Sequence, residues 1–160
     1  MKIRTLLCLL AFACSLLGAA QAQVPQYGPN VSHEQARTVV AAAIADARKQ
    51  SLPMAVAVVD TAGQLVAFER MDNTQTGSTL VAQDKATSAA MFRRPTKAFQ
   101  DAVAGGGAGL RILTLRGANA IEGGLPLVVD AKIIGAIGVS GGSAEQDGVV
   151  AKAGTDALAK

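Results

Sequence analysis

The clearest pattern of apolar and polar positions lies between residues 32 and 51, where small apolar residues recur every three or four positions. That spacing places them on one face of a helix. Ser32 and Gln35 have the spacing of a capping box at its start, and Leu52-Pro53 ends it. We therefore predict a first helix whose apolar face consists of Ala36, Val39, Val40, Ala43, Ile44 and Ala47.

Two stretches have the pattern of β-hairpins. Residues 54–69 begin with an unbroken apolar run, pass through an Asp-Thr-Ala-Gly turn and continue with alternating apolar and polar positions. Residues 125–139 repeat this arrangement around the turn Asp130-Ala131-Lys132. Each stretch predicts two antiparallel strands, because so short a turn can join only antiparallel neighbours.

Three further helices are predicted. One covers residues 78–92, and a short one covers residues 96–103 after an Arg-Arg-Pro junction that interrupts the helical pattern. A glycine-rich connection follows at residues 105–109, and the last helix begins after Ser143, which has a glutamine at the capping-box spacing. The order of elements predicts an α/β (α+β) fold with a mainly antiparallel sheet flanked by helices.

The first 22 residues have the pattern of a secretory signal. Two basic residues precede an apolar run at Leu6–Leu17, which is too short to span a bilayer, and Ala20-Gln21-Ala22 supplies the small residues of a cleavage site. We expect residues 1–22 to be removed, residues 23–31 to form a flexible N-terminal segment and residues 32–160 to form a single domain. The mature protein is then expected in the periplasm or secreted, without membrane insertion.

Removal of this leader changes the composition in two ways. Cys8 and Cys14 are the only cysteines, so the mature chain has no disulfide, thiol nucleophile or thiolate metal ligand. Loss of Lys2 and Arg4 from the 15 basic residues leaves 13 against 12 acidic residues, a net charge of +1. With only 3% aromatic residues, the chain lacks the basic face and stacking surface of a nucleic-acid binder.

Candidate chemistry is concentrated in a few places. His33 is the only histidine and lies in the first turn of the first predicted helix, where it could be a surface residue beside the cap or a metal ligand. Arg93, Arg94 and Lys97, with Arg111 and Arg116 further on, face only one acidic residue between positions 91 and 120. This excess of positive charge indicates an anion site or a solvated junction, and the neighbouring Met91, Phe92 and Phe99 favour an anion with an apolar body.

Other polar residues are explained more simply. Val139-Ser140-Gly141-Gly142-Ser143 joins a strand to a helix and lacks the lysine of a phosphate-binding loop. Asp60 and Asp130 are turn residues, and the helix dipole accounts for acidic residues just after Ser143. The spacing of the carboxylates selects no catalytic pair, so we expect a binding protein rather than an enzyme.

Four motifs stand out along the chain, namely Val58–Val66 (VVDTAGQLV), Lys85–Ala90 with Phe92–Lys97 (KATSAA, FRRPTK), Glu122–Asp130 (EGGLPLVVD) and Gly135–Gly142 with Glu145–Asp147 (GAIGVSGG, EQD). Together they resemble the GlcG/HbpS-like haem-binding proteins, and the resemblance covers residues 32–158. It implies a profilin-like fold with a five-stranded sheet, a tendency to form homo-oligomers and haem binding in some members. Some relatives are credited with haem degradation or with sensing beside a membrane kinase.

The resemblance and the residue chemistry together predict an exported protein that buffers, stores or presents haem. Arg93, Arg94 and Lys97 are the expected partners of the haem propionates, with Arg116 also near the cofactor and Met91 and Phe92 against the macrocycle. His33 is the expected axial ligand of the iron, and the other residue types able to ligate iron are Met54, Met71, Met91 and Tyr27. A threonine that serves as a weak iron contact in some relatives has no counterpart between Thr114 and Glu122.

Two other functions fit the same sequence. The basic residues could bind the carboxylate of a small organic acid such as glycolate, in an enzyme or an accessory protein. The chain could also be a ligand-free oligomeric interaction module, or a sensor module that acts with a membrane protein.

Overall fold

The computed structural model describes residues 24–158, so the predicted signal at residues 1–22 lies outside the described residues. The elements follow one another as β1 (Gln26–Tyr27), α1 (His33–Lys49), β2 (Ala55–Asp60), β3 (Leu65–Arg70), α2 (Ser78–Phe92), α3 (Lys97–Ala104), the 3₁₀ helix η1 (Gly107–Thr114), β4 (Gly124–Val129), β5 (Lys132–Ser140) and α4 (Ala144–Asp156). None of the helices in this part of the chain is long and apolar enough to cross a membrane.

The five strands form one sheet around β5. β5 pairs with β2 on one side and β4 on the other, both antiparallel, and β3 pairs with β2 at the far edge. The short β1 lies parallel to the start of β5, where Gly28 N–H donates to the Ile133 carbonyl at 2.8 Å. The predicted fold class, a mainly antiparallel five-stranded sheet flanked by helices, is confirmed.

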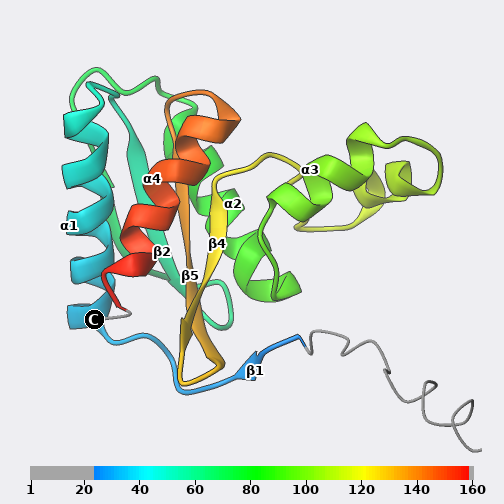
Figure 1. Cartoon of the computed structure of the whole chain (residues 1–160), viewed down its shortest axis with the longest axis horizontal. Coiled ribbons are helices and arrows are strands. Elements are labelled where there is room, and N and C mark those ends of the chain that lie inside the picture. Colours follow the sequence, from blue (N-terminus) through cyan, green and yellow to red (C-terminus); the bar gives the residue numbers. More distant parts are fainter. Residues whose placement is uncertain (1–23, 159–160) are drawn as a thin grey trace, which may run out of the picture.

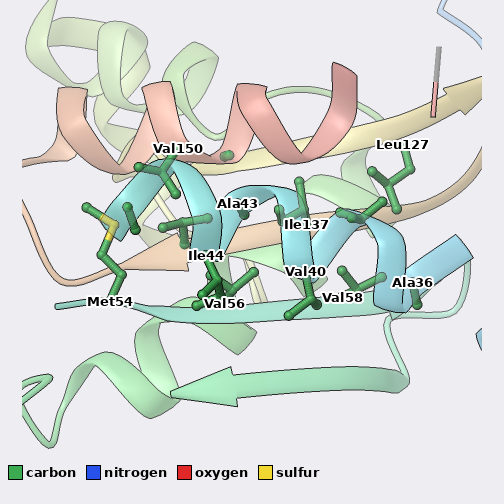
Figure 2. Close-up of a cluster of buried hydrophobic side chains, with 14 of the residues drawn as sticks. Ala36, Val40, Ala43, Ile44, Met54, Val56, Val58, Leu127, Ile137 and Val150 are labelled. Carbon is green, nitrogen blue, oxygen red and sulfur yellow. The ribbon is translucent and has the colours of Figure 1, made fainter. Parts of the chain in front are cut away.

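Helices cover both faces of the sheet (Figure 1). α1 and α4 pack on one face, and α2 packs on the other against β2, β4 and β5. The apolar side chains of α1 predicted from its spacing are buried against the sheet and α4, together with Met54, Val56, Val58 and Ile137 (Figure 2). The α2 face is built mainly from alanine, which brings the helix close to the sheet: a Cβ at Gly138 would overlap the Ala82 carbonyl.

The two predicted capping boxes are confirmed. Gln35 N–H donates to Ser32 Oγ at 3.1 Å, and Gln146 N–H donates to Ser143 Oγ at 3.3 Å. In both cases the glutamine side chain accepts from the N–H of the serine, so two otherwise unpaired donors at each helix start are satisfied.

The structure differs from the sequence-based expectation between α2 and β4. The short predicted helix begins at Lys97 rather than Thr96, and the glycine-rich connection leads into the 3₁₀ helix η1, which was not predicted. α3 and η1 extend away from the sheet as an arm (Figure 1). The arm ends are held together where Thr96 and Gly124 exchange two hydrogen bonds, of 3.0 and 2.9 Å.

Candidate functional site

His33 is one of the residues that line a groove between α1 and the edge strand β3. The groove has a volume of about 760 Å³ and is open to solvent along the edge of the sheet. It forms there because no further strand pairs with β3 among residues 24–158. Its lining residues are His33, Glu34, Arg37, Thr38, Val40, Ala41, Val66, Ala67, Phe68 and Glu69.

The groove combines three kinds of side chain. His33 and Arg37 are one helical turn apart on α1, so both project toward the same side of the helix. Val66 and Ala67 on β3 supply an apolar wall, whereas the Phe68 side chain packs against the alanine cluster on the α2 face of the sheet. Glu69 is already partnered, because Arg48 Nη2 lies 3.7 Å from its carboxylate. An imidazole, a guanidinium group and an apolar wall are thus available to one ligand.

Arg93 lies at the end of α2, where the chain turns sharply. It adopts a left-handed conformation with φ of 54° as the C-cap of that helix. Its guanidinium lies 5.5 Å from the centre of the Tyr27 ring and donates to Gln26 Oε1 at 3.4 Å. The Tyr27 hydroxyl donates to the carbonyl of Ala90 at 2.9 Å, which fixes β1 against the end of α2.

The other predicted anion-binding residues point in different directions. Arg94 lies over the Phe99 ring at 5.5 Å, and Phe99 packs edge-on against Phe92. Lys97 forms an ion pair of 2.7 Å with Asp101, and this hydrogen bond raises the pKa of Lys97. Met91 is half-exposed beside the turn at Gly63, and Arg116 is exposed after η1.

A second pocket lies at the edge of β4 and contains Arg93. Its volume is about 320 Å³, and it is lined by Pro25, Arg93, Pro95, Leu125, Pro126, Val128, Ile133, Lys152 and Thr155. Six of these nine side chains are apolar, and two are cationic. We refer to it below as the β4-edge pocket.

The structure therefore does not bring the predicted site residues into one pocket. His33 lines the α1–β3 groove, Arg93 lines the β4-edge pocket, and no residue lines both. Met91, Phe92, Arg94, Lys97 and Arg116 line neither, and their contact with haem stays a prediction. Among the other residue types able to ligate iron, Met54 is fully buried in the core and the Tyr27 hydroxyl is committed to backbone carbonyls.

Lys85 and Asp147 form a buried ion pair that the sequence does not predict. Lys85 on α2 and Asp147 on α4 are almost completely buried, and Lys85 Nζ lies 2.7 Å from Asp147 Oδ2 and 3.1 Å from the Val139 carbonyl. Asp147 also accepts from Gly142 N–H at 2.9 Å. Burial raises the pKa of the Asp147 carboxyl, against the opposing effects of Lys85 and of the backbone donors.

Two glycine pairs, Gly123-Gly124 and Gly141-Gly142, lie next to this ion pair. Gly123 has φ of +123°, and a Cβ there would lie 2.8 Å from Asp147 Cβ and 2.9 Å from Lys85 Nζ. Glycine is required at that position both by the backbone conformation and by the lack of space. The polarity of Lys85 and Asp147 is typical of exposed residues, and no local sequence signal indicates their burial, because they are 62 positions apart.

Comparison with known proteins identifies the family. A family model described as "Haem degrading protein HbpS-like" matches residues 31–156, nearly all of the part that the structure describes. The chain belongs to the HbpS-like family. The resemblance drawn from the four sequence motifs is thereby confirmed.

Relatives and solved structures agree with membership of the HbpS-like family. Protein GlcG of Escherichia coli strain K12 is 39% identical over 110 residues, which cover 69% of this chain and 81% of GlcG. An uncharacterized 15.0 kDa protein of Citrobacter freundii is 33% identical over 127 residues, covering 78% of this chain and 89% of that protein.

Two solved structures share this fold, and one of them is a complex with haem. The crystal structure of a complex of PduOC with haem has a TM-score of 0.73 and 30% identity, covering 80% of this chain and 94% of PduOC. The crystal structure of HbpS has a TM-score of 0.75 and 27% identity, covering 88% of this chain and 98% of HbpS. A function related to haem is therefore supported for this chain.

Proposed function

We propose that this protein binds haem in the α1–β3 groove, with His33 as the axial ligand of the iron. The observation that carries the proposal is that His33, the only histidine of the sequence, lines this groove, which is larger than the β4-edge pocket. Imidazole is a common axial ligand of haem iron, and grooves of 300–1,000 Å³ are typical of cofactor sites.

Three other residues of the groove fit the rest of the cofactor. Val66 and Ala67 offer an apolar wall to the macrocycle, and Arg37 offers a guanidinium group to a propionate. Haem supplies redox-active iron when it is bound. The apolar side chains would hold the ring, His33 would ligate the iron, and Arg37 would neutralise one propionate carboxylate.

We further propose that the protein acts outside the cytoplasm as a haem-buffering, haem-storing or haem-presenting protein. The secretory pattern of residues 1–22 supports export. Large exposed apolar side chains, such as Leu80 and Leu113, which are 68% and 67% exposed, support assembly into a homo-oligomer. A membrane sensor protein is a further proposed partner, which the family resemblance suggests.

Titration of the protein with haemin, followed through the Soret absorption band, tests the location of the site. Arg37→Ala should weaken haemin binding by about 10- to 100-fold, because a charge-assisted hydrogen bond contributes roughly 1.5–3 kcal/mol. The double variant Arg93→Ala/Arg94→Ala is the comparison, since neither residue lines the groove. If the double variant weakens binding and Arg37→Ala does not, the haem lies at the end of α2 instead.

A second candidate function is the binding of a small organic acid in the same groove, by an enzyme or an accessory protein. The polar side chains of Arg37, Thr38 and His33 favour it, because together they could bind a carboxylate and a hydroxyl group. Calorimetric titration with glycolate and with haemin separates the two functions. A stable multimer that responds to neither ligand would identify an interaction module.

A further inference from the structure

The β4-edge pocket has an apolar body with rigid walls. Proline lines it at positions 25, 95 and 126, and Leu125, Val128 and Ile133 complete the apolar surface. Val128 is 46% exposed although it is large and apolar. A ligand that covered this surface would remove apolar area from water, which favours binding.

The two charged residues that line the pocket, Arg93 and Lys152, are both cations. Arg93 approaches from the end of α2 and Lys152 from α4, and none of the nine lining residues is a carboxylate. Arg93 is held in place by the Tyr27 ring and by Gln26. Lys152 forms an ion pair with Asp156 one turn further along α4, but both side chains are more than half exposed, so the lysine can exchange this partner at little cost.

We propose that the β4-edge pocket is a second binding site, for a ligand that has an apolar body and a carboxylate group. The apolar walls take the body, and Arg93 and Lys152 bind the carboxylate. The pocket offers no ligand to haem iron, because none of its lining residues is a histidine, methionine, cysteine or tyrosine. It therefore goes beyond the proposed haem site, with which it shares no residue.

Two sources could supply this chemistry, namely a fatty acid and the propionates of a porphyrin. The first probe is dodecanoate, titrated into ¹⁵N-labelled protein and followed by NMR. We expect saturable shifts of the amide signals of Leu125, Val128 and Ile133. No saturable shift in these residues, or shifts confined to the α1–β3 groove, would overturn the proposal.

Charge variants test the role of the two cations. Arg93→Gln and Lys152→Gln should each weaken dodecanoate binding about tenfold. Arg94→Gln is the matched control, because this neighbouring arginine does not line the pocket and should leave the affinity unchanged. Lys152 is exposed, so its variant reports on binding even if Arg93→Gln disturbs the fold. Unchanged affinity in Lys152→Gln and in the double variant Arg93→Gln/Lys152→Gln would overturn the assignment.

A competition experiment distinguishes the two sources. Metal-free protoporphyrin IX is added to the complex with dodecanoate, and the amide signals of the pocket are followed in the wild type and in His33→Ala. Displacement of dodecanoate in both proteins identifies a porphyrin-compatible carboxylate site. Dodecanoate that remains bound in both identifies a fatty-acid site.

Discussion

Lys85 and Asp147 form an ion pair of 2.7 Å that joins α2 on one face of the sheet to the first turn of α4 on the other. Their side chains are only 1% and 4% exposed. The pair also reaches the end of β5 through the Val139 carbonyl and the turn before α4 through Gly142 N–H. Because the residues around it come from distant parts of the chain, the pair fixes how these segments meet.

Replacement of one partner of this pair should be strongly destabilising. Lys85→Met leaves the Asp147 carboxylate buried without its cation, so we expect a loss of about 3–5 kcal/mol in the free energy of unfolding. Urea denaturation followed by circular dichroism measures it. The double variant Lys85→Met/Asp147→Leu should recover most of the loss, since it buries no unpaired charge. A cost below about 1 kcal/mol for the single variant would contradict the role of the pair.

Gly123→Ala tests the packing around the ion pair. The added Cβ would lie 2.8 Å from the Val139 carbonyl oxygen and 2.9 Å from Lys85 Nζ, and φ of +123° is unfavourable for alanine. We expect a destabilisation of about 3 kcal/mol, measured by thermal unfolding. Gly77→Ala is the matched control, because nothing lies within 4 Å of its Cβ and its φ is −61°. Equal effects of the two substitutions would argue against a crowded position at Gly123.

The Tyr27 hydroxyl should hold β1 in place. Tyr27→Phe keeps the ring under Arg93 but removes the hydrogen bonds to the carbonyls of Ala90 and Met91, at a cost of about 1 kcal/mol. Hydrogen exchange measures the local effect. Gly28 N–H, which donates to Ile133, should exchange faster, while Val139 N–H in the core should keep its protection. Unchanged protection of Gly28 would show that β1 does not depend on this hydroxyl.

Glu145 should contribute to the pH dependence of stability. Its own backbone N–H and the Ser143 hydroxyl, at 2.9 Å, lower the pKa of this carboxyl in the folded protein. A lowered folded-state pKa gives stability that is present above the ordinary pKa, near 4.5, and is lost as the pH falls through the lowered value.

Glu145→Gln should therefore lose less stability than the wild type on acidification below pH 4.5. Urea denaturation at a series of pH values between neutrality and about 3 measures this difference. Identical pH profiles of the two proteins would contradict the lowered pKa.

Local sequence signals were sufficient to predict most of the fold. The capping boxes at Ser32 and Ser143 and the apolar face of α1 depend on residues close in sequence, and the structure confirms them. β1 was missed because Gln26–Tyr27 has no pattern of its own and is a strand only through its pairing with β5. η1 was missed because a glycine-rich stretch predicts turns rather than a 3₁₀ helix.

The candidate site was less predictable. Arg93, Arg94 and Lys97 are close in sequence, and charge alone suggested a common ligand. The left-handed turn at Arg93 and the packing of Arg94 on Phe99 direct these side chains to different places. The groove at His33 depends on α1 crossing the edge strand β3, a tertiary arrangement that no local pattern records. The burial of Lys85 likewise depends on Asp147, 62 residues away.

His33 is the residue on which the proposed haem site depends most. The most direct test is a haemin titration of the wild type and of His33→Ala, with the position and saturation of the Soret band recorded for both. We predict a saturable shift in the wild type and, in the variant, a bound-state spectrum without histidine ligation or no saturable binding. A variant whose bound haem has the spectrum and affinity of the wild type would contradict axial ligation by His33.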